Sequence, residues 1–149
     1  MTADTDFTVE VEESLTGKYM QKMLSGRHEL IADEPENAGG NDAGPNPYAY
    51  LLMGLGACTS MTLRMYAEMK QLPLRRVRVR LSHRKMHARD CSDCETREGK
   101  IDEITREITL EGNLTEEQRQ RLVEIANRCP VHRTLTSEIK VRTRLVQSE

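Results

Sequence analysis

Apolar and polar residues alternate near the start of the chain, and this alternation predicts strands. Phe7, Val9 and Val11 fall on one face of the first strand, with polar residues between them. Two further short strands are expected at 19–25 and 28–33. Together the three segments predict a β-meander in the N-terminal third of the chain.

The most apolar stretch follows a loop at 35–47 that is dense in Gly, Pro, Asn and Asp. Asn46 suits a helix N-cap, and helical spacing then holds to about Lys70, before Pro73 prevents continuation. This helix is apolar nearly all round, which is typical of a helix buried on several sides. Because so short a chain offers little sheet to cover it, we expect a second copy of the chain to do so, giving a homodimer.

The second half of the chain alternates between strand and helix patterns. Strands are predicted at 74–83 and 104–110, with a polar, cysteine-bearing insert between them. A capping box at 115–118 opens a helix that runs through Ala126. Alternating apolar residues at 139–145 predict a last strand. This order indicates an α+β fold, with helices packed on largely antiparallel sheet.

Length and composition favour a single domain over residues 1–149. The formal net charge is only −2, which argues against nucleic acid or an anionic membrane surface as a partner. No run approaches the roughly 20 apolar residues of a membrane span, and the acidic, polar start is unlike a signal peptide. We therefore expect a cytoplasmic protein, in which cysteines are seldom structural disulfides.

The four cysteines fall into two groups. Cys58 lies within the long helix, and Cys129 lies at the end of the later helix, where Pro130 is expected to close it. One interpretation makes them two buried, inert thiols. The other makes them a redox pair, which needs the two sulfurs in contact and a positive group that lowers the pKa of the attacking thiol. Their spacing in the sequence leaves both interpretations open.

The second group lies in the polar insert. His83, His87, Cys91 and Cys94 form the pattern H-x3-H-x3-C-x2-C, whose two imidazoles and two thiolates match the ligands of a tetrahedral zinc site. A hydrophilic loop with two reduced cysteines, or a functional disulfide, fits the same residues. All three interpretations remain hypotheses at this point.

Two segments resemble the OsmC family, named for osmotically inducible protein C and including the organic hydroperoxide resistance proteins. They are GGNDAGPNPYAYLLMGLGACTSMTLRMYAEMK and ITLEGNLTEEQRQRLVEIANRCPVHRTL. The resemblance implies an intertwined homodimer, in which antiparallel sheets from both chains are wrapped around two long central helices.

The resemblance also implies thiol-dependent reduction of organic hydroperoxides. Cys58 would be the peroxidatic cysteine and Cys129 the resolving one, with electrons from a small dithiol or a dithiol-bearing protein and no cofactor required. Two alternatives stay open: a catalytically weak redox sensor or small-molecule binding protein of the same fold, and a variant stabilised by zinc at the insert.

A cation near Cys58 is a further expectation. Hydroperoxide-reducing members carry an arginine in the first hairpin and a glutamate just after the N-P that opens the long helix. Lys18 and Tyr48 occupy those places here. Because Cys58 lies in mid-helix, we expect no activation from a helix N-terminus, and Lys18 is the candidate cation. Arg27, Arg64 and Arg133 are alternative cations, although each also fits an ordinary surface or interface charge.

Overall fold

The computed structural model describes residues 7–147, which form two compact units. One unit comprises the chain up to Gly54 together with Leu81–Thr105. The other comprises Leu55–Arg80 and the chain after Thr105. Most residue contacts lie within one unit or the other. The α+β class is confirmed, since helices combine with two antiparallel sheets.

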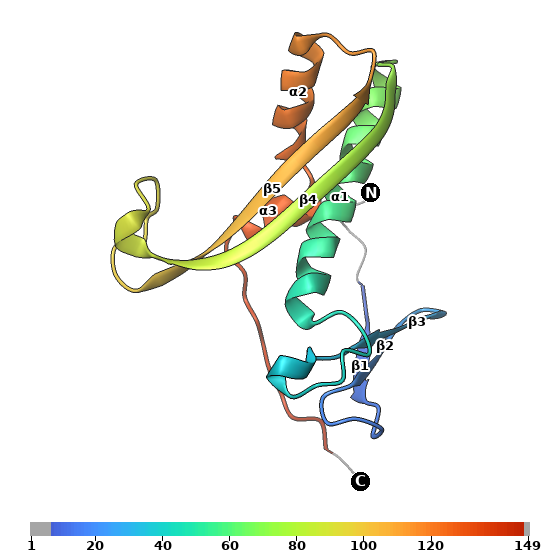
Figure 1. Cartoon of the computed structure of the whole chain (residues 1–149), viewed down its shortest axis with the longest axis vertical. Coiled ribbons are helices and arrows are strands. Elements are labelled where there is room, and N and C mark those ends of the chain that lie inside the picture. The colour runs from blue at the N-terminus through green and yellow to red at the C-terminus, as the bar shows by residue number, and fades with distance from the viewer. Residues whose placement is uncertain (1–6, 148–149) are drawn as a thin grey trace. The chain divides into compact units, whose positions relative to one another are not determined.

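The first unit begins with the predicted meander, which is confirmed. Strands β1 (Glu10–Glu13), β2 (Gln21–Ser25) and β3 (His28–Ala32) pair antiparallel in that order (Figure 1). The apolar face predicted for the first strand is uncovered in the single chain, since Phe7 is 85% exposed and Val11 is 56% exposed. Nothing in the described chain covers that side of β1.

A buried carboxylate organises the loop after β3. Asp33 is only 2% exposed, and its Oδ1 accepts the N–H of Glu34 at 2.8 Å. Its Oδ2 accepts the N–H groups of Asn41 at 3.2 Å and Ala43 at 3.1 Å. These bonds fold the loop, which includes the 3-10 helix η1 (Glu36–Ala38), back on itself ahead of the long helix.

The long helix α1 spans Pro47–Met69, close to its predicted range. Asn46 is confirmed as its N-cap, since its Oδ1 accepts the N–H of Ala49 at 2.8 Å. At the other end Gln71 adopts a positive φ of 54°, which ends the helix before Pro73. No helix among residues 7–147 is long and apolar enough to cross a membrane.

The next two strands are longer than their patterns predict. Strand β4 spans Leu74–His87 and β5 spans Lys100–Gly112, and they form a two-stranded antiparallel hairpin (Figure 1). Much of the predicted polar insert is therefore strand, because polar side chains are tolerated on a sheet with solvent beside it. Only the tip is irregular, and it contains the 3-10 helix η2 (Ala88–Asp90).

The second unit packs helix α2 (Glu116–Ala126) over part of α1. The predicted capping box at its start is confirmed: Thr115 Oγ1 accepts the N–H of Gln118 at 3.1 Å, and Gln118 Oε1 accepts the N–H of Thr115 at 2.9 Å. The core cluster is aliphatic, consisting of Leu63, Leu122, Ile125 and Ala126. Half-buried residues from β4 and β5 pack against it, including Val77 and Ile108.

The predicted last strand is wrong for the single chain. Residues 138–147 form no strand, and Ile139, Val141 and Leu145 are 53%, 85% and 95% exposed. Alternation describes which side chains would share a face, but a strand also needs a neighbour for its backbone hydrogen bonds. Within the described residues no strand pairs with this segment.

Substituting Asp33→Asn should destabilise the first unit and weaken its response to acid. Burial alone would raise the pKa of Asp33, but the three N–H donors outweigh it and hold the pKa below its ordinary value. Stability from this carboxylate is therefore present above the unfolded-state pKa, and it is lost as pH falls through the lower folded-state pKa. Thermal unfolding measured from about pH 7 to pH 3 tests this.

The matched control is Asp42→Asn, which removes an exposed carboxylate from the same loop. It should leave both the thermal midpoint and its acid dependence close to those of the parent chain. An Asp33→Asn variant with the parent's acid dependence would contradict the assignment.

Candidate active site

The structure brings the two buried cysteines together. Cys58 lies in α1 and is 5% exposed, while Cys129 is fully buried and is the N-cap of the short helix α3 (Pro130–Leu135). Both thiols are free, and they lie close enough to hydrogen bond to each other. Of the two requirements for a redox pair, contact between the sulfurs is therefore met.

The first turn of α3 supplies hydrogen bonds to both sulfurs. Pro130 has no N–H, and the next two N–H groups point to different thiols. The N–H of Val131 hydrogen bonds to the Cys58 sulfur, and the N–H of His132 donates to Cys129 Sγ at 3.2 Å. The N-terminal N–H groups of a helix have no partner inside it, so the sulfurs satisfy them.

One expectation is corrected here. Pro130 does not close α2, because α2 ends at Ala126 and Pro130 is the first residue of α3. The Val131 N–H at the start of α3 lowers the pKa of Cys58, but the effect of burial is larger, so the start of α3 does not activate this thiol.

A threonine fixes the direction of the Cys129 proton. Thr59 is fully buried, and its hydroxyl donates to the carbonyl of Leu55 at 2.7 Å. Its Oγ1 also lies 3.8 Å from Cys129 Sγ. Because a hydroxyl has one proton and Leu55 takes it, the Cys129 thiol must be the donor in this contact.

Arg106 of β5 is the cation held beside this network. Its guanidinium donates to Thr59 Oγ1 at 3.0 Å, to the carbonyl of Ala126 at 3.3 Å and to Asn127 Oδ1 at 2.8 Å. Burial, together with the positive charge of Arg106, holds the pKa of His132 below its ordinary value. The guanidinium is thus linked to Cys129 by two hydrogen bonds in series, through Thr59.

Our sequence analysis missed Arg106, although a signal was present. The apolar face of β5 reads Ile104, Ile108 and Leu110 at alternate positions, and Arg106 takes the remaining place on that face. An arginine in an inward register predicts a buried partner for its charge.

Burial raises the pKa of the Cys58 thiol. The neighbouring Cys129 sulfur raises it further, whereas the Val131 N–H and the Thr62 hydroxyl lower it. The raising effects win, so Cys58 is a protonated thiol at neutral pH. Its reactive thiolate is a minor form that becomes more populated as pH increases.

Lys18 and Tyr48 belong to the first unit, and each has an aromatic or imidazole ring as its neighbour there. The Lys18 ammonium lies 5.2 Å from the centroid of the Tyr19 ring. The Tyr48 ring stacks on His83, with centroids 4.8 Å apart and planes at 11°. The expected role of Lys18 beside Cys58 stays a prediction.

The four predicted zinc ligands are not assembled into one cluster. His83 Nε2 lies 2.8 Å from Asp102 Oδ1, and Cys91 and Cys94 are joined by a disulfide. Among the described residues, the two cysteines are grouped with the Asp93 carboxylate and with neither histidine. A tetrahedral site built from all four predicted residues would need rearrangement of the hairpin tip.

Replacing Arg106 with Gln should affect both stability and thiol chemistry. The substitution leaves the buried Thr59 oxygen and the Ala126 carbonyl with weaker hydrogen-bond donors. This loss should lower the free energy of unfolding by about 1–3 kcal/mol. The substitution also removes a positive charge that is linked to Cys129 through Thr59, so alkylation of Cys129 should become slower. Urea denaturation and peptide-resolved alkylation measure the two effects.

Arg119→Gln is the matched control. Arg119 is equally half-buried and donates to the carbonyls of Leu110 at 2.7 Å and Gly112 at 2.9 Å, with no bond to a thiol or to Thr59. It should lose stability to a similar extent and leave the alkylation profile unchanged. If both variants shift that profile equally, Arg106 has no specific role at the thiols.

Comparison with known proteins bears on the same region. The sequence profile of the family described as OsmC-like protein matches residues 39–144, which include both free cysteines and Arg106. No curated protein matches the chain.

Solved structures with similar folds extend over most of the chain. An OsmC-like protein from Mycoplasma pneumoniae shares 20% identity at a TM-score of 0.67, covering 89% of this chain and 88% of its own. An organic hydroperoxide resistance protein from Elizabethkingia anophelis shares 19% identity at 0.67, covering 94% of both chains. The organic hydroperoxide resistance protein OhrB of Bacillus subtilis shares 20% at 0.61, covering 90% and 93%. At these identities the likeness concerns the fold.

Proposed function

Because the chain belongs to the OsmC family, we propose that it reduces organic hydroperoxides with the thiols of Cys58 and Cys129. The observation that carries the proposal is the pairing of two buried sulfurs from separate helices, each held by an N–H of α3. Two inert core thiols would need neither the contact nor the hydrogen bonds. Several similar structures are of organic hydroperoxide resistance proteins, and this description suggests the substrate class.

The reaction has two steps at this pair. The Cys58 thiolate attacks one peroxide oxygen, the O–O bond breaks, and the other oxygen leaves as an alkoxide that takes a proton to become an alcohol. Cys58 is then a sulfenic acid. The Cys129 sulfur attacks the Cys58 sulfur, hydroxide leaves as water, and a disulfide forms. A dithiol outside the chain returns two electrons and two protons, which restores both thiols.

The residues around the pair suit this division of roles. Cys129 already donates its proton toward Thr59 and accepts the His132 N–H, so its position is fixed before Cys58 is oxidised. Arg106 lies behind Thr59 and favours negative charge on Cys129 when it attacks. Both thiols are buried, which favours small reactants over large ones.

The test is turnover of tert-butyl hydroperoxide with dithiothreitol as the reductant. The parent chain should consume many equivalents, faster as pH rises because the pKa of Cys58 is raised. Cys58→Ser should abolish consumption, a loss of at least a hundredfold, since the nucleophile is gone. In a separate reaction without dithiothreitol, Cys129→Ser should consume one equivalent and keep a sulfenic acid on Cys58 that mass spectrometry detects, because no resolving thiol is left.

Cys91→Ser with Cys94→Ser is the matched control, because it also removes two thiols but leaves the buried pair intact. This variant should turn over at the parent rate. Full turnover by Cys58→Ser would rule out the proposed mechanism.

A redox sensor is the second candidate, favoured by the raised pKa of Cys58. A thiol that is mostly protonated reacts slowly, which suits a protein oxidised once per signal more than a rapid catalyst. A sensor would form the Cys58–Cys129 disulfide with one equivalent of peroxide and would then consume little more, even with dithiothreitol present. The same assay therefore separates the two functions.

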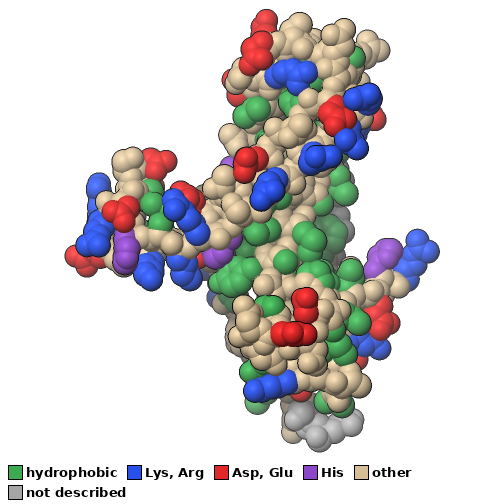
Figure 2. All heavy atoms as spheres, viewed as in Figure 1, with side chains coloured by type: hydrophobic (Ala, Val, Ile, Leu, Met, Phe, Trp, Pro, Cys, Tyr) green, Lys and Arg blue, Asp and Glu red, His purple; other side chains and the backbone are tan. Residues whose placement is uncertain are grey.

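We further propose that the chain works as a homodimer, most simply in a cytoplasm that supplies dithiol reductants. The support is exposed apolar surface on α1: Met53, Met61, Met65 and Met69 are 48%, 58%, 49% and 69% exposed. Figure 2 shows hydrophobic side chains on the visible surface of the molecule. Methionines exposed along one helix are typical of a surface that another chain covers.

Light scattering at micromolar concentration should give a mass near twice 17.0 kDa. Met65→Glu places a charge on the exposed apolar surface and should shift the protein toward monomer. Gln120→Glu, an exposed position on α2, should leave the dimer unchanged. A monomeric parent chain would refute the proposal.

A further inference from the structure

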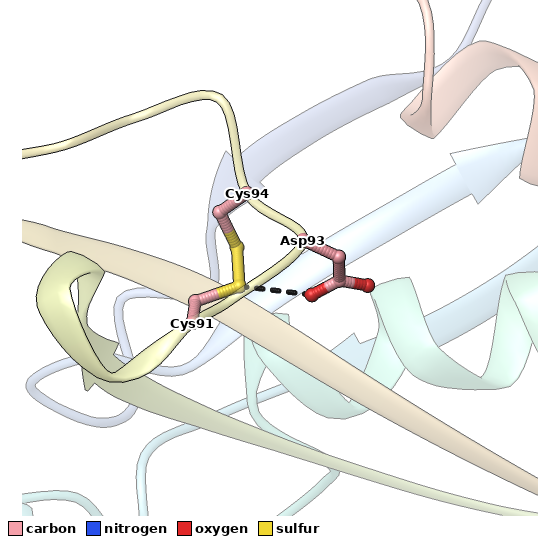
Figure 3. A group of neighbouring side chains, drawn as sticks. All are labelled: Cys91, Asp93 and Cys94. Atoms are coloured by element: carbon pink, nitrogen blue, oxygen red, sulfur yellow. Dashed lines mark hydrogen bonds between the residues drawn. A yellow bond between two sulfur atoms is a disulfide. The ribbon is translucent and has the colours of Figure 1, made fainter.

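The tip of the β4–β5 hairpin holds a second pair of cysteines in a different environment. Cys91 and Cys94 are both partly exposed and are joined by a disulfide, with their Cα atoms 5.5 Å apart (Figure 3). This Cα distance falls within the range that a disulfide accepts without moving the backbone. The pair therefore forms its disulfide in place.

This disulfide adds little to the fold. It joins residues only three apart, and the entropy removed from the unfolded chain by a crosslink is smallest for the shortest loops. The tip has other supports: the N–H of Ala88 donates to the carbonyl of Gly99 at 2.8 Å, and the N–H of Cys91 donates to the carbonyl of Ala88 at 3.1 Å. Ala88 is 3% exposed. Breaking the S–S bond leaves these contacts intact.

The Asp93 carboxylate distinguishes the two sulfurs. Its Oδ1 lies 3.2 Å from Cys91 Sγ (Figure 3). The disulfide sulfur has no proton, so this contact becomes a hydrogen bond only when Cys91 is a thiol. In the reduced pair, that bond and the negative charge of the carboxylate favour the thiol form of Cys91. In the oxidised pair, the negative charge repels a thiolate that approaches Cys91, so attack on Cys94 is favoured.

We propose that Cys91 and Cys94 form a second, reversible dithiol–disulfide centre, which exchanges electrons with external dithiols independently of the buried pair. A thiolate of the external dithiol attacks Cys94 Sγ, the Cys91–Cys94 bond breaks, and Cys91 leaves and takes a proton. The second thiol of the external dithiol then attacks its own sulfur in the mixed disulfide. Cys94 is released and protonated, and the external dithiol becomes a disulfide, so two electrons and two protons have moved.

The test equilibrates the full chain, under native conditions, with buffers that contain dithiothreitol and its oxidised form in stepped ratios. Reduced cysteines are then alkylated, and each site is quantified by peptide mass spectrometry. The Cys91–Cys94 pair should pass between fully oxidised and fully reduced as a two-electron couple, with the same midpoint from either direction. Circular dichroism and the thermal midpoint should change little across the transition.

Three results would overturn the proposal. Reduction only after the protein unfolds would make the pair a structural crosslink. Failure to reoxidise in the oxidised buffers would make it a pair of inert thiols. One equivalent of zinc on the two thiolates, in protein purified without chelator, would make it a metal site.

Asp93→Asn tests the difference between the two sulfurs. In the reduced protein, loss of the charge should speed alkylation of Cys91 at neutral pH by about three- to tenfold and leave Cys94 nearly unchanged. Asp90→Asn removes a carboxylate from the same tip, with no bond to either sulfur, and should change neither rate. Equal effects of the two variants would show that Asp93 acts only through general charge and would remove its assigned role.

Discussion

Partly buried N–H groups at the start of α3 are the constraint on which the candidate site depends. A backbone donor removed from water needs an acceptor, and the first turn of a helix offers none of its own. Pro130 removes one donor, and the sulfurs of Cys58 and Cys129 take the next two. The same hydrogen bonds that satisfy the backbone therefore hold α1 and α3 together and set the two thiols side by side.

Sequence patterns predicted the secondary structure correctly where it depends on residues within one segment. Asn46 caps α1 and the capping box at 115–118 opens α2, because caps depend on residues within one turn. The same patterns failed where the structure of a segment depends on a neighbouring strand. The apolar alternation at 139–145 is real, yet the segment is not a strand, since no neighbouring strand is present among the described residues. The boundaries of the hairpin also shifted, because pairing can carry strands into polar sequence.

The two thiols of the candidate site were predicted from the sequence, but the threonine that contacts Cys129 and the arginine that contacts this threonine were not. Resemblance pointed to Cys58 and Cys129, but no spacing rule shows that residues so far apart in sequence touch. Arg106 escaped notice because a single arginine among apolar strand positions looks like an exception to the pattern. Its meaning comes from tertiary contacts with Thr59 and the end of α2. Arginines that fall in an apolar register therefore merit the same scrutiny as cysteines.

The two cysteine pairs show how surroundings divide one chemistry into two. At the buried pair, removal of water raises the pKa of Cys58, and the Val131 N–H and the Thr62 hydroxyl offset this only in part. Burial restricts this pair to small reactants, both for the peroxide that oxidises it and for the dithiol that reduces it. At the hairpin tip, solvent supports charge, and the Asp93 carboxylate makes Cys91 and Cys94 unequal. Because Cys91 and Cys94 are partly exposed, larger dithiols can approach them as well. The same thiol chemistry thus meets a different range of reactants at each pair.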